Sequence, residues 1–467
     1  MNASPRVLVA SHDVVGSQMA GPGVRYWELA KVLAQYFPVK IAAPDGSCVP
    51  ESSVVEFVTY GHSDPSVLRS ALGWSDVAIV GSDVLLVCPE LRHWTKPLVV
   101  DGYDPHTIET LALWAGFETL ETQMRRYRPR VELLSLQARA ADLIICASEI
   151  QRVWWLGILE MNGRVNPHTY LEDPSLRRLV DVVPYGLPSR SFLDKEESDV
   201  IPSVGADDLV LLWGGGLWQW LDPLTVIAAM PRVLERFPNA KLLFPGTRHP
   251  NPGMPDMPKV TEAVELSKRL GLLDRSIHFG DWVPRSEWPR YLARADVGLS
   301  AHIRSVESKL AFRSRVLDYI WAGVPMVVTR GDATSELVEK YGVGLLVDSE
   351  NVLDTADAVI ELLSRSPGWA DAAFEKAREE LTWERAAFPL IEFCRAPRRA
   401  PDKEASTQQA EAVSLEIERA VGYTDAVSAL RQERDRLEAL VTSYERGRFV
   451  RFTKWLDRLL RALGIST

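Results

Sequence analysis

Four residues that could exchange protons or hydrogen bonds follow one apolar run in the segment PLVVDGYDPHTIETL: Asp101, Tyr103, Asp104 and His106. In open α/β sheets, ligands bind beyond the carboxyl ends of the strands, where such a loop lies. A carboxylate or an imidazole there can accept a proton from a hydroxyl group of a substrate. The alternative is that Asp104 caps the following helix and Tyr103 packs against it. We interpret the four residues as catalytic.

A glycine-rich turn stands between the first apolar run and a segment of helical period, GPGVRYWELAKVLA. In this turn, Gly21 and Gly23 leave backbone N–H groups free to bind an anion at a helix N-terminus. The alternative is a tight turn without a ligand, because glycine patterns of this kind are weak signals. We predict a ligand-binding role for both glycines.

A second run of glycines, Gly214, Gly215 and Gly216, directly follows the apolar run LVLLW. Three consecutive glycines let the backbone approach a diphosphate closely. The aromatic ring of Trp218, two residues further on, could stack on a base or a sugar. A bare turn is the alternative here as well. This second turn predicts a site for a diphosphate.

Charged residues gather in the segment HIRSVESKLAFRSRVLDYIWAGVPMVVT: Glu307, Lys309, Arg313, Arg315 and Asp318. The pattern places them at the approach to one helix or inside it. Basic groups there could neutralise a diphosphate leaving group. A carboxylate such as that of Asp318 could hold ribose hydroxyls, as acidic residues do in dinucleotide-binding folds. The alternative is an ordinary charged helix face.

The elements that must position these residues follow a βαβ pattern, in which short apolar runs alternate with longer segments of helical period. The expected strands of the first half are RVLVAS, VKIAAP, VVEFVTY, VAIVGS, PLVVDG, DLIICAS and VDVVPYG. After a polar stretch the pattern restarts with LVLLWGGG, AKLLFPG, SIHFGDW, VGLSAH, PMVVT and VGLLVD. The predicted fold class is therefore α/β, with two facing Rossmann-like domains of parallel sheet and a cleft between them.

We predict domain boundaries from the same pattern. An N-terminal Rossmann-like domain spans residues 1–187, and a linker spans 188–207. A second Rossmann-like domain spans 208–397 and ends in a helix that crosses back toward the first. The rest of the chain is divided into a linker (398–410), a short coiled coil (411–445) and a basic amphipathic helix (446–467).

The composition excludes several classes of protein. The net charge of −10 argues against a general affinity for nucleic acid. The four cysteines are far apart and lack metal-ligand spacing, so we expect reduced, mostly buried thiols of a cytosolic protein. There is no signal-peptide pattern and no run of about 20 apolar residues, so we expect no membrane-spanning helix. The expected location is the cytoplasm, with peripheral contact to the inner face of the cytoplasmic membrane through the tail.

The tail carries two different patterns. A heptad seam with one charged position predicts the coiled coil, a candidate for homo-oligomer formation: Val427, Leu430, Arg434, Leu437, Val441 and Tyr444. From Arg446 onward, six basic residues and one acid give +5 in a chain that is otherwise acidic. Aromatic and leucine residues fall on the opposite helix face, which suits an anionic membrane interface. The alternative is a helix that docks on a neighbouring subunit.

Residues 5–395 resemble glycosyltransferase family 4 and its near relatives. The stretch LDYIWAGVPMVVT resembles the family's Leu-Glu-Ala-Met-x-x-Gly-x-Pro-Val-Val element, with Asp318 where relatives bind the nucleotide ribose. VDVVPYGLP resembles the Pro-Asn-Gly-Val element at the domain junction, and GPGVRYWELAKVLA resembles the glycine-rich first loop. AKLLFPG, IHFGDWVP and ARADVGLSAH resemble the segments around the donor base. The resemblance implies a GT-B fold, with an acceptor-side domain followed by a donor-binding domain.

The sequence departs from the family at the diphosphate. Relatives carry an Arg and a Lys soon after the glycines, and GGGLWQWLDP has neither. The first glutamate of the family's paired motif aligns with Leu310, and a family glycine aligns with Arg313. We therefore predict that Lys309 and Arg313 bind the diphosphate. By position alone, His106 corresponds to the family's catalytic-side histidine.

The resemblance implies transfer of a sugar from a nucleotide diphosphate sugar to an acceptor hydroxyl, with retention of the anomeric configuration and with a glycan or lipid-linked acceptor. No metal cofactor is demanded, because no Asp-x-Asp pair follows a strand where metal-dependent transferases carry one. Two alternatives remain open. A nucleotide-sugar epimerase of the same fold would turn over the donor without an acceptor. A scaffold with a decayed donor site would bind no nucleotide sugar.

Overall fold

The computed structural model describes residues 4–17, 19–50, 55–115, 118–188, 192, 201, 203–247, 257–405, 433–434 and 436–437. The chain divides into two compact units, Met1–Pro401 and Asp402–Thr467. The first unit holds both sheets. The predicted coiled coil (411–445) lies outside the described residues except for residues 433–434 and 436–437, which are helical. The predicted amphipathic helix (446–467) lies wholly outside them.

The first sheet has seven strands in the order β3-β2-β1-β4-β5-β6-β7, and every pairing is parallel. Its strands are β1 (Val7–Ala10), β2 (Val39–Pro44), β3 (Glu56–Tyr60), β4 (Val77–Gly81), β5 (Leu98–Asp101), β6 (Leu143–Cys146) and β7 (Val180–Val182). Alternate residues of β1 enter two different apolar clusters: Val7 and Val9 one, Leu8 and Ala10 the other. Continuous apolar runs therefore form these strands because both faces of the sheet are covered.

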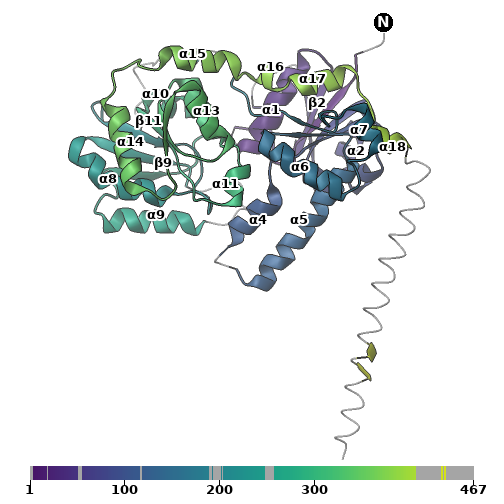
Figure 1. The fold of residues 1–467 in the computed structure, drawn as a ribbon, viewed down its shortest axis with the longest axis horizontal. Coiled ribbons are helices and arrows are strands. Elements are labelled where there is room, and N and C mark those ends of the chain that lie inside the picture. Colours follow the sequence, from purple (N-terminus) through teal and green to yellow (C-terminus); the bar gives the residue numbers. More distant parts are fainter. Residues whose placement is uncertain are drawn as a thin grey trace, which may run out of the picture. The chain divides into compact units, whose positions relative to one another are not determined.

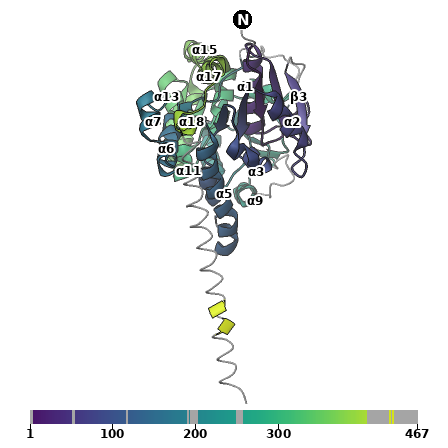
Figure 2. The same cartoon turned by 90° about the vertical axis from the view of Figure 1, so that its right-hand side faces the viewer.

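The helices of the first domain are α1 (Gly21–Ala34), α2 (Ser66–Trp74), α3 (Val84–Val87), η1 (Pro89–His93), α4 (His106–Trp114), α5 (Leu120–Ala140), α6 (Glu149–Met161) and α7 (Pro167–Glu172). Helix α2 packs beside the edge strand β3 (Figure 2). Helices α4 and α5 pack on each other and lie next to one another in Figure 1. Together these helices bury the apolar side chains of the first sheet.

The second sheet has six parallel strands in the order β10-β9-β8-β11-β12-β13. They are β8 (Leu209–Trp213), β9 (Ala240–Pro245), β10 (Ile277–Gly280), β11 (Val297–Ser300), β12 (Met326–Thr329) and β13 (Gly344–Val347). The helices here are α8 (Pro223–Arg236), α9 (Pro258–Arg269), α10 (Trp288–Arg294), α11 (Val306–Leu310), α12 (Ser314–Ala322), α13 (Ala333–Tyr341), α14 (Val352–Ser364) and α15 (Asp371–Glu380). The predicted α/β class with two parallel sheets is confirmed.

After α15 the chain returns to the first domain through α16 (Trp383–Ala386) and α17 (Phe388–Arg395), which lie close to α1 in Figure 1. The Arg395 guanidinium lies 5.2 Å from the ring centre of Tyr36. Arg399 forms an ion pair of 3.1 Å with Asp142 of the first domain. The short α18 (Pro401–Ala405) follows. The C-terminal part of this unit therefore fastens the second domain to the first.

Each sheet reverses its strand order once, between β1 and β4 in the first domain and between β8 and β11 in the second. Such a reversal leaves neighbouring loops pointing apart, and ligands bind there in open α/β sheets. The loops that follow these four strands are therefore the places to look for a site. Among the described residues, no helix has the length and hydropathy needed to cross a membrane.

Candidate active site

Asp101, the last residue of β5, forms a buried ion pair with Arg25 of α1. Both carboxylate oxygens accept hydrogen bonds from Arg25, at 2.6 Å from Nε and 3.0 Å from Nη2, and neither side chain has exposed surface. Arg25 also donates from Nη2 to the Val183 carbonyl at 2.8 Å. A carboxylate held in this way stabilises the ends of β5 and β7. It offers no free surface to an acceptor, contrary to the catalytic role predicted for Asp101.

Tyr103 and Asp104 lie in the loop after β5. The Tyr103 ring is buried, and the Arg25 guanidinium lies 4.9 Å from its centre. The Asp104 side chain does not cap α4, whose N-cap is Pro105 without any side-chain cap. Burial, together with the carboxylate of Glu109, raises the pKa of Asp104 well above its usual range. Perturbed carboxyl groups are common at sites of proton transfer, so Asp104 remains a candidate for the predicted catalytic role.

Glu109 lies one turn into α4, and its pKa is raised to about 7 by burial and by the Glu307 carboxylate. Glu307 belongs to α11 of the second domain, which contacts α4. Asp104 therefore lies near Glu109 within the first domain, and Glu109 lies near a carboxyl group of the second. Glu109 was not among the predicted site residues, although it follows Asp104 by five residues.

His106 is the first residue of α4 and points to a different partner. Its Nε2 lies 3.1 Å from Oε1 of Gln137, a buried residue of α5. Burial lowers the pKa of His106, so its imidazole is neutral at physiological pH. Its Nδ1 and the Gln137 Nε2 are buried without a hydrogen-bond partner among the described residues. His106 thus belongs to a polar cluster separate from Asp101.

That polar cluster lies at the β1/β4 reversal. His12 follows β1, and its Nδ1 lies 3.3 Å from the Tyr26 hydroxyl. Asp83 follows β4 and pairs with Arg130 of α5 at 2.5 Å. Burial opposes ionisation of Asp83, but its pKa is still lowered, by His12 and Arg130. His12, Asp83 and Arg130 were not among the predicted site residues. The available signal was the presence of polar residues directly after the first and fourth apolar runs.

The first glycine turn shows two different uses of glycine. A Cβ on Gly23 would lie 2.3 Å from the Val14 carbonyl oxygen, so packing alone requires glycine there. A Cβ on Gly21 would lie 3.4 Å from the Tyr185 hydroxyl, an ordinary contact. For Gly23 the structure therefore supports the tight-turn alternative, and the ligand-binding role remains a prediction for Gly21.

The second glycine turn, Gly214–Gly216, packs against the first turn of α12. A Cβ on Gly214 would lie 3.2 Å from the Arg315 Cβ, and one on Gly215 would lie 3.7 Å from the Arg315 Nη2. Gly215 has a φ of +84°, which side-chain-bearing residues rarely adopt. The Gly214 N–H donates to the Tyr319 hydroxyl at 2.7 Å. The glycines thus bring the backbone up to a basic side chain.

Arg315 is the cation at this turn. Its guanidinium lies 5.1 Å from the ring centre of Trp213, the last residue of β8. No ion pair joins it to a carboxylate of the described residues, and its Nη1 is buried without a hydrogen-bond partner there. Burial lowers the pKa of Arg315 to about 10, so the side chain is still charged at pH 7. An unpaired, partly buried guanidinium beside a glycine turn is suited to an anion.

Asp318 lies one turn after Arg315 on α12. Its Oδ2 accepts a hydrogen bond of 3.0 Å from the Trp288 indole N–H. Burial raises the pKa of Asp318, against the opposing effects of Arg285, Trp288 and Arg315. Arg315 faces the end of β8, whereas Asp318 is joined to the Trp288 ring, which would lie 3.4 Å from a Cβ on Gly214. Asp318, predicted to bind the ribose, therefore lies close to the Arg315 guanidinium.

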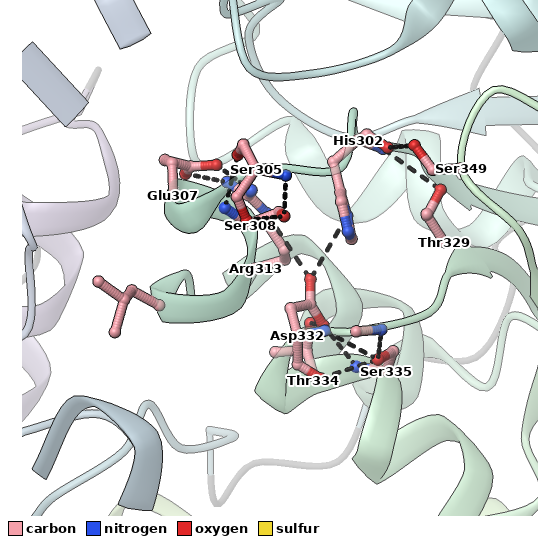
Figure 3. Close-up of polar contacts among 12 residues, drawn as sticks. His302, Ser305, Glu307, Ser308, Arg313, Thr329, Asp332, Thr334, Ser335 and Ser349 are labelled. Carbon is pink, nitrogen blue, oxygen red and sulfur yellow. Dashed lines mark hydrogen bonds and ion pairs between the residues drawn. The ribbon is translucent and has the colours of Figure 1, made fainter. Parts of the chain in front are cut away.

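Arg313 is already paired, unlike Arg315. It is the residue before α12 and forms two hydrogen bonds with Glu307, at 2.9 and 2.7 Å. Its Nε and the His302 Nδ1 each lie 3.7 Å from the Asp332 Oδ2, as the dashed lines in Figure 3 show. All four side chains are buried. The predicted role of Arg313 at the diphosphate would require it to leave two carboxylates.

The buried network around Arg313 keeps its histidine neutral. Burial and the charges of Arg313 and Arg315 lower the pKa of His302 to about 3. Lys309, the other predicted diphosphate ligand, is exposed on α11. The predicted charged helix is in fact two helices, α11 and α12, interrupted at residues 311–313. This break separates Lys309 from the turn of α12 that faces the glycines.

Trp218 stacks on Trp220 with their rings nearly parallel, at 5.4 Å and 6°. A Cβ on Gly216 would lie 3.4 Å from the Trp218 indole nitrogen. Asp222 caps α8 by accepting from the Thr225 N–H at 3.0 Å. Trp218 therefore lies beside the glycine turn with one ring face already covered.

The two domains meet through loops at the carboxyl ends of their strands. Tyr185, after β7, stacks on Phe312 of the second domain at 5.9 Å and 15°. The Arg285 N–H donates to the Ser17 carbonyl at 2.9 Å. One apolar cluster includes residues of both sheets. The loop that carries Asp104 and the segment that leads into α12 and Arg315 thus belong to the same face-to-face arrangement.

No group of three His, Cys, Asp or Glu side chains in the described part of the chain is placed to hold a metal ion. The four cysteines are free thiols, of which Cys48 is exposed and the others are buried.

Residues 208–365 match the family model described as glycosyl transferases group 1. This match covers the second sheet, the glycine turn and the α11–α12 segment. The comparison with curated proteins found no match.

Solved structures share the fold of both domains. Sucrose-phosphate synthase from Thermosynechococcus elongatus aligns with a TM-score of 0.60 at 15% identity, over 83% of this chain and 98% of its own. WaaG, a glycosyltransferase of lipopolysaccharide biosynthesis, aligns with a TM-score of 0.55 at 15% identity, over 84% of this chain and 100% of its own. Anabaena HepE in complex with UDP and glucose aligns with a TM-score of 0.58 at 14% identity, over 83% of this chain and 98% of its own. The fold is therefore GT-B, as predicted.

Proposed function

We propose that this chain, a glycosyltransferase whose C-terminal domain belongs to the group 1 glycosyl transferases, moves a sugar from a nucleoside diphosphate sugar to an acceptor hydroxyl. The observation that carries the proposal is the unpaired Arg315 guanidinium beside the Gly214–Gly216 turn. HepE, which has the same fold, was solved with UDP and glucose and with UDP-glucose. A uridine or guanosine diphosphate donor fits the same chemistry.

Arg315 would neutralise the diphosphate as the bond between the sugar and phosphate breaks. Charge that develops on the leaving group is stabilised best by a fixed cation in a partly buried place. The N–H groups at the start of α12 favour an anion in the same position. Asp318, one turn further on, would accept hydrogen bonds from the ribose hydroxyls. We assign the diphosphate to Arg315 in preference to Lys309 and Arg313, and Asp318 keeps the ribose role predicted from the sequence.

Asp104 would face the acceptor. In the transfer, the glycosidic C–O bond forms, the bond between the sugar and phosphate breaks, and the acceptor loses its hydroxyl proton. Asp104 would take up that proton, as the carboxyl group of the loop after β5 whose pKa is raised by burial and by Glu109. Retention of the anomeric configuration is the outcome that we propose from the resemblance, and product NMR would test it.

We propose a glycan or a lipid-linked glycan as the acceptor. The basic composition of residues 446–467 suits contact with an anionic membrane, at about 1 kcal/mol per basic residue. Co-sedimentation with anionic vesicles tests this point. The full chain should pellet at low salt, and a chain ending at Tyr444 should remain in solution. A halved oligomer mass on truncation, without vesicle binding by either chain, would identify the tail as an assembly element.

Calorimetry with UDP and GDP tests the donor site. Arg315→Ala should raise the dissociation constant by roughly tenfold to a hundredfold, because a charge-assisted hydrogen bond contributes about 1.5–3 kcal/mol. Lys309→Ala, which removes an exposed cation of the neighbouring helix, serves as the control and should stay within about twofold of the parent chain. Unchanged binding by Arg315→Ala would overturn the assignment. Absence of nucleotide binding by the parent chain would overturn the function.

A further inference from the structure

One side chain, that of Gln151, joins the acceptor-side loop to the donor-side helix. Gln151 lies in the first turn of α6, and 1% of it is exposed. Its Nε2 donates to the Tyr103 carbonyl at 2.7 Å and to the Leu310 carbonyl at 2.7 Å. Its Oε1 accepts from the Ala147 N–H at 2.7 Å. Both amide hydrogens and the amide oxygen are therefore used, and the amide orientation is fixed by its partners.

The two carbonyl groups belong to opposite halves of the proposed site. Tyr103 precedes Asp104 in the loop after β5 of the first domain. Leu310 ends α11 of the second domain, three residues before the Arg313 that pairs with Glu307. Gln151 thus holds the backbone that carries Asp104 against the backbone of the Glu307–Arg313 pair. A shift of either backbone would leave a buried carbonyl or a buried amide unpaired.

This bond lies apart from the segments where the chain passes between the domains. There, the Leu187 N–H donates to the Leu381 carbonyl at 2.6 Å, and the Trp383 N–H donates to the Leu187 carbonyl at 3.1 Å. Backbone bonds at the crossing segments persist when two domains rotate about them. A side-chain bond elsewhere is made or broken by such a rotation.

We propose that Gln151 is a positioning residue that latches the two domains together and sets Asp104 at its working distance from the bound donor. The expected effect on turnover rests on the proposed function. The contact that Gln151 makes between the two domains does not. Misplacement of a reacting group by about 1 Å can lower turnover about a hundredfold. Loss of Gln151 should therefore lower turnover more than it weakens donor binding.

The same helix offers a matched control. Trp155, one turn after Gln151, donates from Nε1 to the Gly102 carbonyl at 2.7 Å and is fully buried. This bond reaches the residue next to Tyr103 but stays within the first domain. Trp155→Phe therefore removes a buried hydrogen bond to the same loop without touching the domain contact. Gln151→Met removes both amide donors at similar side-chain volume.

Pulsed electron spin resonance between labels in the two domains tests the latch directly. Exposed Val67 of α2 and exposed Leu353 of α14 are replaced by cysteine and labelled, in a chain carrying Cys48→Ser. Gln151→Met should broaden the distance distribution and shift it to longer values. Trp155→Phe should match the parent chain. An unchanged distribution in Gln151→Met would overturn the proposal, whether or not the chain binds nucleotide.

Gln151→Glu gives a second measurement should the Met variant fail to fold. Its neutral form can donate to one carbonyl, and its ionised form to neither. Its distance distribution should narrow when the pH is lowered from 8 to 5, and no response to pH would count against the latch.

Kinetics give a third measurement. In Gln151→Met, nucleoside diphosphate release from a donor sugar should fall about tenfold or more, while the dissociation constant for UDP or GDP should stay within about twofold of that of the parent chain. Loss of affinity without loss of turnover would contradict a positioning role.

Discussion

Arg25 and Asp101 form a two-point ion pair, at 2.6 and 3.0 Å, between the first helix and the fifth strand, and neither side chain is exposed to solvent. The rings of Tyr103 and Tyr185 lie 4.9 and 5.3 Å from the same guanidinium. A charge pair in such surroundings is costly to break, because the remaining charge has no water to solvate it. This geometry favours a structural role for Asp101 over the predicted catalytic one.

Asp101→Asn should therefore destabilise the fold by about 3–5 kcal/mol, since it leaves Arg25 charged and buried. The measurement is urea unfolding followed by circular dichroism. Asp76→Asn is the matched control, because Asp76 pairs with Arg6 on the surface and should cost less than about 1 kcal/mol. Normal stability with lost turnover in Asp101→Asn would restore the catalytic interpretation.

Arg313 should behave as a structural residue rather than as a diphosphate ligand. Arg313→Met leaves the Glu307 carboxylate buried without its partner, so the free energy of unfolding should fall by about 3–5 kcal/mol. Adding Glu307→Leu should recover part of that loss, because the unpaired charge is then removed. Nucleotide affinity should change less than in Arg315→Ala. A loss of affinity equal to that of Arg315→Ala, with unchanged stability, would favour Arg313 as a ligand.

Glu109 should give the stability a pH dependence of defined sign. Its pKa is about 7 in the folded chain against an ordinary value of 4.5, so the folded state favours its protonated form. Its ionisation therefore lowers stability progressively between about pH 4.5 and 7. Glu109→Gln should raise the free energy of unfolding on the order of 2 kcal/mol at pH 8 and leave it nearly unchanged at pH 4. Equal effects at both pH values would show that the carboxylate does not titrate in this range.

Local patterns were sufficient to predict the fold. Every apolar run identified in the sequence forms a strand, from β1 to β13, because continuous burial on both sheet faces leaves a signal in adjacent residues. Asp222-Pro223 begins α8 as its capping pattern indicates. The grouping into two parallel sheets follows from the same alternation of strands and helices.

The charge partners could not be predicted in the same way. Arg25 and Asp101 are far apart in the chain, and neither local sequence pattern indicates that they pair. The choice between Arg313 and Arg315 depends on where α12 begins. Because it begins at Ser314, Arg313 turns back to Glu307 and Arg315 faces the glycines. A boundary shift of one or two residues, within the ordinary uncertainty of helix ends, decides which arginine is free.

Asp318 should recognise the ribose, and an isosteric variant can separate this role from a structural one. Asp318→Asn can still accept the hydrogen bond from the Trp288 indole, which spans 3.0 Å, so the fold should be preserved. It loses the charge that strengthens hydrogen bonds from ribose hydroxyls, so the dissociation constant for UDP or GDP should rise about tenfold. The parent chain should bind 2′,3′-dideoxy analogues about as weakly as the variant binds the ribonucleotide. In Asp318→Asn the dissociation constants for the analogue and the ribonucleotide should differ by less than about twofold.

Calorimetry with both ligands makes the comparison. Trp288→Phe, which removes the hydrogen bond to the Asp318 carboxylate, is the control for its orientation. Equal loss of affinity for both ligands in Asp318→Asn would instead mean that Asp318 supports α12 and does not touch the ribose.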